Sequence, residues 1–139
     1  ELVERIAAYA RNLTTQAFIV CPQNGLSIID DASSIRSSSY LAIVDAVGLE
    51  DLYFNYFSLA DKAYRLNLLA LFHGAGKKIL NVEYIASTLY GDYRDLLQNQ
   101  TNGIVGYAAR PDRELDELLA PFGAKPAKAL PWLNLLLMN

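Results

Sequence analysis

The chain has 139 residues, which suits one ordinary domain. Hydrophobic residues make up 53% and charged residues 19%, a composition that favours a globular protein and excludes a disordered one. The net charge of -3 excludes the basic surface typical of nucleic-acid-binding proteins, and no apolar run reaches the ~20 residues of a membrane-spanning helix.

The counts of cysteine and histidine narrow the chemistry further. Cys21 is the single cysteine, so an internal disulfide and a multi-cysteine zinc site are excluded. His73 is the single histidine, which argues against a histidine-rich metal site. The chain starts at Glu1, inside a predicted helix and without Met or a capping residue, so we expect upstream sequence to be missing.

The first half of the chain predicts helices and strands in alternation. In chain order, we expect a helix, a strand, a helix and a strand at residues 1–12, 17–21, 33–43 and 45–50. Apolar residues recur at helical spacing in the first of these segments. The second is a continuous apolar run ended by Pro22, which is typical of a strand buried on both faces. Ser33 and Ser34 are candidate N-caps for the next helix.

The second half continues the same alternation. We expect a helix, a strand, a helix, a strand and a short helix at residues 59–72, 78–83, 88–98, 104–107 and 113–119. Gly74 and Gly76 end the first of these helices, and Asp112 is a candidate cap for the last one. Residues 121–139 contain three prolines and an apolar end, and we assign them no structure.

Strands that recur every ~25–35 residues with helices between them predict βα units and a parallel sheet. Two architectures satisfy this pattern: a small open doubly wound sheet, and half of a (β/α)₈ barrel, which typically needs ~250 residues. No glycine-rich phosphate-binding motif follows any predicted strand, so nucleotide binding has no support, and we expect no cofactor.

Polar residues follow each predicted strand, where parallel α/β folds collect their functional groups. These residues are Gln23, Asn24, Glu50, Asp51, Glu83, Tyr84, Tyr107 and Arg110. Helix starts and loops also favour polar residues, so each pair taken alone could be a cap. Because all four strand ends carry them, we favour a shared polar pocket.

Glu50 is the strongest catalytic candidate, because it directly follows the apolar stretch 47–49. A carboxyl group beside apolar walls can keep its proton at neutral pH and act as a general acid. The alternative is a solvated carboxylate in a first helical turn, and Asp51 is more often a cap. Glu83 and Tyr84 could bind hydroxyl or ammonium groups of a substrate, or Glu83 could form an ion pair with a neighbouring strand.

Three stretches resemble the endo-α-1,4-polygalactosaminidase-like glycoside hydrolases of family 114. They are residues 18–25 (FIVCPQNG), 44–54 (VDAVGLEDLYF) and 76–84 (GKKILNVEY). The resemblance covers about residues 1–120. It implies a (β/α)₈ barrel of the TIM type, of which this chain would be the C-terminal half with strands five to eight, followed by a tail at 121–139.

The resemblance also implies a function. By the resemblance, Glu50 would be the general acid/base, and Asn24, Glu83 and Tyr84 would bind the substrate, a galactosamine-containing polysaccharide. From their places after predicted strands, we add Asp51 and Tyr107 to the substrate-binding residues. The family has Asp-Tyr where this sequence has Glu83-Tyr84. Such proteins are commonly secreted or held at the cell surface. The family's second essential carboxylate is an aspartate on the fourth strand, and this chain lacks it.

Two expectations follow from the missing aspartate and the missing half of the barrel. A glycosidase needs two carboxyl groups, so the isolated chain should have little or no activity. A half-barrel has open sheet edges and an apolar inner face, so it should self-associate or pair with its missing N-terminal half. Two alternatives remain open: a non-catalytic carbohydrate-binding or structural module, and an unrelated small α/β protein with an open sheet.

Overall fold

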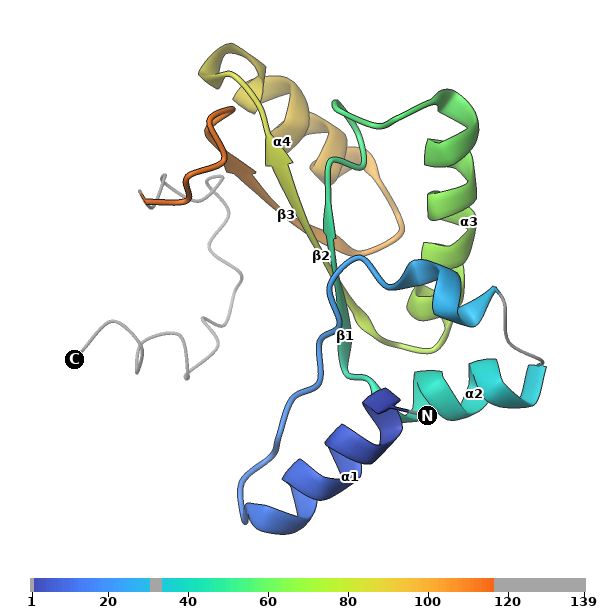
Figure 1. The fold of residues 1–139 in the computed structure, drawn as a ribbon. Helices are drawn as coiled ribbons and strands as arrows, with labels where there is room; N and C mark the ends of the chain where they lie inside the picture. Colours follow the sequence, from blue (N-terminus) through green and yellow to red (C-terminus); the bar gives the residue numbers. More distant parts are fainter. Residues whose placement is uncertain (1, 31–33, 117–139) are drawn as a thin grey trace.

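The structure is a computed structural model that describes residues 2–30 and 34–116. From residue 34 to residue 109 its helices and strands alternate as the sequence predicts, and Figure 1 shows their arrangement. The elements are α1 (Leu2–Leu13), η1 (Leu26–Ile29), α2 (Ser34–Ile43), β1 (Ala46–Glu50), α3 (Leu59–Gly74), β2 (Lys78–Tyr84), η2 (Ser87–Leu89), α4 (Tyr90–Asn99) and β3 (Ile104–Ala109). The predicted tail at 121–139 lies outside the described residues.

The strands form a parallel sheet with the order β1-β2-β3. Val47 pairs with Ile79, and Ile79 pairs with Ile104, so one register runs across the three strands. Parallel neighbours need a crossover connection. Here α3 joins β1 to β2 and α4 joins β2 to β3, and both helices lie on the same side of the sheet (Figure 1).

The hydrophobic core lies between that side of the sheet and the helices. Val47, Leu49 and Ile79 point toward it from the sheet, and Leu69 and Phe72 of α3 pack against them, all with at most 1% of their surface exposed. Burial of one such side chain contributes about 1.5–3 kcal/mol. This contact fixes α3 against β1 and β2 and so positions the ends of both strands.

Apolar side chains on other surfaces remain exposed. Leu80 and Val105 alternate with the core residues of β2 and β3, and they are 42% and 58% exposed. The apolar stripe of α1 is exposed as well. It consists of Leu2, Ile6, Tyr9 and Leu13.

The predicted strand at 17–21 is wrong as a regular strand, although its Val20 carbonyl accepts hydrogen bonds from the Asp45 and Ala46 N–H groups at 2.9 and 3.3 Å. The chain just after it also runs alongside β1. The Gly48 N–H donates to the Pro22 carbonyl and the Asn24 N–H donates to the Gly48 carbonyl, both at 2.9 Å, which makes a parallel bridge between Gln23 and Gly48. Extending this ladder backwards would need an N–H on residue 22, which proline lacks. The ladder therefore stops at one bridge.

The predicted fold class, the C-terminal half of a (β/α)₈ barrel with strands five to eight, is also wrong. The described residues form an open sheet of three strands with its connecting helices on one side, a small α/β fold. The repeat of strand and helix along the sequence is common to barrels and open sheets. This repeat therefore does not predict how many strands pair or whether the sheet closes into a barrel.

The predicted helix at 113–119 is wrong over its described part, residues 113–116. Arg113 and Leu115 have φ angles of 66° and 54°, which are incompatible with a right-handed helix. The Asp112 carboxylate accepts a hydrogen bond from the Glu114 N–H at 3.2 Å. This local turn competes with helix formation, as aspartate often does in short polar segments.

Candidate functional site

Glu50, the predicted catalytic residue, is the last residue of β1 and is half-buried. Leu49 points into the core, so Glu50 points to the opposite face of the sheet, because side chains alternate along a strand. Its Oε1 atom accepts hydrogen bonds from Gln23 Nε2 at 3.3 Å and from the Tyr84 hydroxyl at 3.4 Å. The segment around Gln23, strand β1 and strand β2 thus meet at the Glu50 carboxylate.

Gly48 makes room for this contact. A Cβ atom at position 48 would overlap the side-chain amide of Gln23, which crosses the strand there on its way to Glu50. Glycine inside a strand often marks such a close approach. The bridge between Gln23 and Gly48 holds the two segments in this register.

Asp51 continues the strand end in an unusual backbone conformation, with φ at 51°. Its Oδ1 atom accepts hydrogen bonds from Asn55 Nδ2 at 3.1 Å and from the Tyr84 N–H at 3.4 Å, and its Oδ2 atom pairs with Arg113. A left-handed residue other than glycine costs free energy and persists where its surroundings fix it. The Asp51 carboxylate is therefore engaged in holding the loop.

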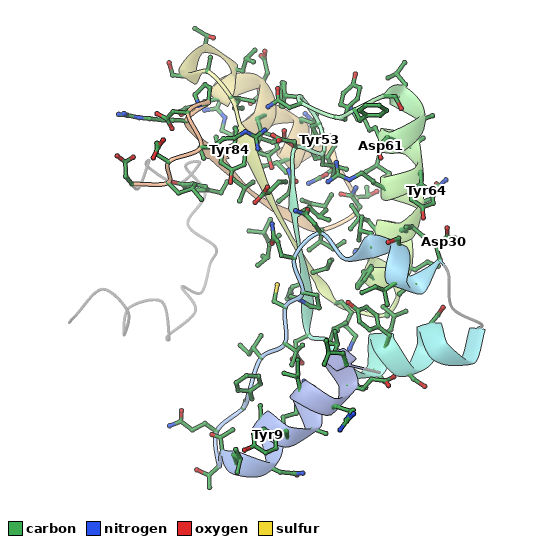
Figure 2. All side chains as sticks on the ribbon, viewed as in Figure 1. Tyr9, Asp30, Tyr53, Asp61, Tyr64 and Tyr84 are labelled. Carbon is green, nitrogen blue, oxygen red and sulfur yellow. The ribbon has the colours of Figure 1, made fainter. Side chains whose placement is uncertain are left out.

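Tyr84 stands between the two carboxylates at the carboxyl end of β2, with 7% of its surface exposed (Figure 2). Burial raises the pKa of its hydroxyl, and the nearby charge of Glu50 and its hydrogen bond raise the pKa further. The guanidinium of Arg113 lies 4.3 Å from the ring centroid and acts in the opposite direction. The hydroxyl therefore stays protonated and available as a donor to Glu50 at neutral pH.

Arg65 of α3 contacts the end of β1 from the helix side of the sheet. Its guanidinium donates to the Glu50 carbonyl at 2.6 Å and to the Asp51 carbonyl at 2.9 Å. These carbonyl groups lie where β1 ends and the chain leaves the sheet. A charged donor on a helix that packs against the sheet satisfies both of them.

Glu83 lies on the other face of β2 from Glu50 and is completely buried. Its carboxylate accepts hydrogen bonds from the Tyr53 N–H at 2.7 Å, the Phe54 N–H at 3.3 Å and Asn81 Nδ2 at 2.8 Å. These contacts tie the loop after β1 to β2. The structure thus separates Glu83 from the predicted substrate-binding residues near Glu50.

The remaining predicted residues also divide between the two faces. Asn24, with φ at 54°, lines a pocket on the helix side together with Leu49. Tyr107 pairs with Val82 in the sheet, which places it on the same face as Glu50 and Tyr84. The structure therefore brings Glu50, Asp51 and Tyr84 into one cluster and leaves Asn24 on the other side of β1.

Three groups at this site are not among the predicted catalytic and substrate-binding residues: the side chain of Gln23, the guanidinium of Arg65 and that of Arg113. The sequence places both Gln23 and Asn24 after the same predicted strand, and the resemblance favours Asn24. The glycine at position 48 is the one signal that could have favoured Gln23. The two arginines come from a helix and a distant loop, and no local pattern marks them.

Residues 2–30 and 34–116 contain no group of three histidine, cysteine, aspartate or glutamate side chains that could hold a metal ion. Within the same ranges no helix has the length and apolar character needed to cross a membrane. The groups that meet at the cluster are the carboxylates of Glu50 and Asp51, the Tyr84 hydroxyl, the Gln23 amide and the Arg113 guanidinium.

Comparison with known proteins finds relatives in prokaryotes. The chain is 29% identical over 127 residues to an uncharacterized protein of Methanocaldococcus jannaschii, an alignment that covers 85% of the chain and 36% of that relative. It is 33% identical over 138 residues to an uncharacterized protein of Thermotoga maritima, covering 92% of the chain and 41% of that relative. The chain thus spans less than half the length of either. No family model and no solved structure matches the sequence.

Proposed function

We propose that the carboxyl end of β1 binds a galactosamine-containing polysaccharide and that Glu50 is the general acid/base of a glycoside hydrolase reaction. The observation that carries the proposal is the half-buried Glu50 carboxylate, oriented by Gln23 and Tyr84 at the end of a parallel sheet. The resemblance of residues 18–25, 44–54 and 76–84 to the family 114 glycoside hydrolases supports the substrate class.

In the proposed reaction Glu50 donates its proton to the glycosidic oxygen as the bond between that oxygen and the anomeric carbon breaks. A second carboxyl group must then act as nucleophile or activate a water molecule. Asp51 is adjacent, but its carboxylate is engaged with Arg113 and Asn55. We therefore assign the second carboxylate to no described residue, and we expect the isolated chain to bind the polymer with little or no hydrolysis.

This engagement of Asp51 favours a second candidate function, a carbohydrate-binding module without catalysis. Binding needs the oriented Glu50 and Tyr84 but no second carboxylate. In either case we place the protein outside the cell or at its surface, on the resemblance alone. The exposed apolar stripe of α1 supports the further proposal that the chain self-associates or packs against additional polypeptide.

The binding part of the proposal is tested by isothermal titration calorimetry of the 139-residue chain with an oligosaccharide of α-1,4-linked galactosamine. Loss of one charge-assisted hydrogen bond costs about 1.5–3 kcal/mol, so Glu50→Gln should weaken the affinity about tenfold or more. Asp92→Asn, which removes an exposed acid from the first turn of α4, is the matched control and should bind as the wild type does. Equal affinity of the Glu50→Gln and wild-type chains would contradict the assignment of Glu50.

A further inference from the structure

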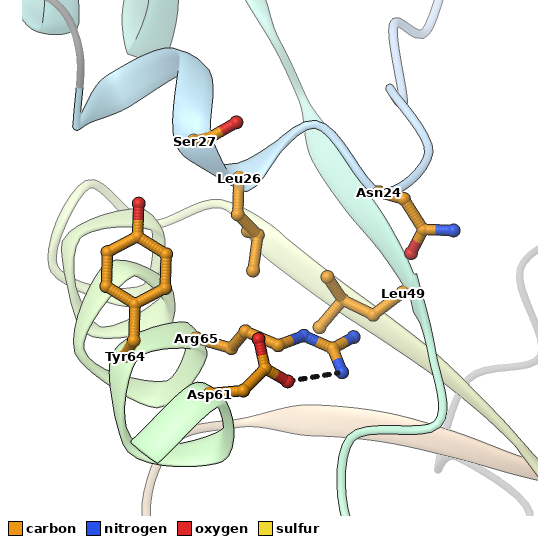
Figure 3. Close-up of a pocket in the computed structure, with 7 residues that line it drawn as sticks. All are labelled: Asn24, Leu26, Ser27, Leu49, Asp61, Tyr64 and Arg65. Carbon is orange, nitrogen blue, oxygen red and sulfur yellow. Dashed lines mark ion pairs between the residues drawn. The ribbon is translucent and has the colours of Figure 1, made fainter. Parts of the chain in front are cut away.

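A pocket of about 330 Å³ opens on the helix side of the end of β1, between η1 and α3 (Figure 3). Small-molecule sites typically measure ~300–1,000 Å³, so this pocket suits one sugar ring. Its floor is formed by the buried side chains of Leu26 and Leu49. The partly exposed ring of Tyr64 forms one wall.

The rim of the pocket is polar and carries donors and acceptors that a ligand could engage. Within the described part of the chain, the side chains of Asn24 and Ser27 make no hydrogen bond, and both residues are exposed. Asp61 faces the pocket from the first turn of α3, and its Oδ2 atom lies 3.9 Å from Arg65 NH1. That distance allows an ion pair but exceeds a hydrogen bond, so the Asp61 carboxylate can still accept hydrogen bonds from a ligand.

Arg65 connects this pocket to the candidate site. The same guanidinium that lines the pocket donates to the backbone carbonyls of Glu50 and Asp51. Leu49 faces the pocket, whereas Glu50 faces the opposite side of β1. A polymer that crosses the end of β1 would therefore meet the Glu50 carboxylate with one unit and the pocket with a neighbouring unit.

We propose that this pocket is an accessory subsite for one amino-sugar unit of the polysaccharide, with the ammonium group at Asp61. The apolar face of the sugar ring packs on Leu26 and Leu49, and its hydroxyl groups meet Asn24 and Ser27. The Asp30 carboxylate accepts a hydrogen bond from the Tyr64 hydroxyl at 2.7 Å and adds negative charge beside the pocket. The two carboxylates of Asp30 and Asp61 thus outweigh the one positive charge of Arg65 and favour a cation there. This inference rests on the proposed function, because it takes the substrate class from it.

The test is a titration of the isotope-labelled 139-residue chain with D-galactosamine, followed by the amide signals in two-dimensional NMR spectra. We expect the signals of Leu26, Leu49 and Tyr64 to move. The dissociation constant should rise about tenfold in Asp61→Asn, and galactose, which lacks the ammonium group, should bind the wild type about tenfold more weakly than galactosamine does. Asp92→Asn is the matched control, and it should leave the dissociation constant unchanged.

Other outcomes separate this inference from the proposed function. Signal changes confined to Gln23, Glu50 and Tyr84 would overturn the subsite and leave the proposed function standing. Pocket signals that respond equally to galactose, or equally in Asp61→Asn, would overturn the assignment of the ammonium group to Asp61. No response to galactosamine would overturn the subsite, while calorimetry with the oligosaccharide would still judge the proposed function separately.

Discussion

At the scale of single residues, Glu83 stabilises the loop that carries Asp51 and Asn55. A buried carboxylate would be costly without donors, and here two backbone N–H groups and the Asn81 amide supply them. The loop in turn places Asp51 in its left-handed conformation beside Tyr84. Glu83 thus acts on the site through the backbone and from the opposite face of the sheet.

The variant Glu83→Gln should therefore destabilise the fold, because an amide has one acceptor oxygen and its NH2 group must face N–H donors at the other position. We expect a loss of about 1–3 kcal/mol in the free energy of unfolding, measured by urea denaturation. The backbone amides of Tyr53 and Phe54 should exchange with solvent faster. Glu114→Gln, at an exposed glutamate, is the control and should be neutral. A Glu83→Gln chain as stable as wild type would refute this role.

At the scale of elements, β3 packs against α4 through a position that has no side chain. A Cβ atom at Gly106 would overlap the ring of Tyr93 and the side chain of Leu97. Tyr93 is fully buried, and its hydroxyl accepts a hydrogen bond from Asn81 Nδ2 at 2.8 Å. Burial therefore raises the pKa of this hydroxyl and keeps it neutral. The close fit of helix and strand depends on glycine at position 106.

Two glycine variants test this packing with opposite expected signs. Gly106→Ala should lower the free energy of unfolding by about 1–3 kcal/mol, because the tyrosine ring cannot move without opening the core. Gly91→Ala, at a position of α4 where a Cβ would meet nothing within 4 Å, should raise it by about 0.5–1 kcal/mol through helix propensity. Denaturant unfolding of both chains gives the comparison. A neutral or stabilising Gly106→Ala would show that α4 packs less closely on β3.

The helices and strands could largely be predicted from sequence, because apolar spacing reports which face of an element is buried. The failures have local causes: Pro22 removes one donor from a ladder, and Asp112 forms a competing turn. Closure of the sheet could not be predicted, since barrels and open sheets share the same alternation. At the site, the adjacency of Glu50 and Tyr84 follows from parallel strands ending together, which the sequence indicates.

The choice between Gln23 and Asn24 could not be made from sequence. A shift of one residue in register moves a side chain to the other face of a sheet, and no local pattern fixes the register of a segment that makes a single bridge. The hydrogen bonds from Arg65 to the end of β1 could not be predicted from sequence either. They depend on how α3 packs against β1, which is a property of the tertiary structure.

At the scale of the whole molecule, the polar side chains of the site gather at one end of the sheet. Tyr84, Tyr53 and Asp61 lie at the carboxyl end of the strands, whereas Tyr9 lies on α1 at the opposite end (Figure 2). The candidate site and the pocket meet at this end of β1, linked by Arg65. A polymer that binds as proposed would contact both the candidate site and the pocket.

The most direct test of the central claim measures the reducing ends released from α-1,4-linked galactosamine polymer by the complete product of the gene that encodes this chain. General acid/base catalysis typically contributes 10²–10⁴-fold, so Glu50→Gln should slow the release by about that factor, while Asp92→Asn should not. A Glu50→Gln protein that releases reducing ends at the wild-type rate would contradict the claim that Glu50 is the acid/base. A folded wild-type protein that binds the polymer and releases none would contradict the hydrolase function and favour the binding module.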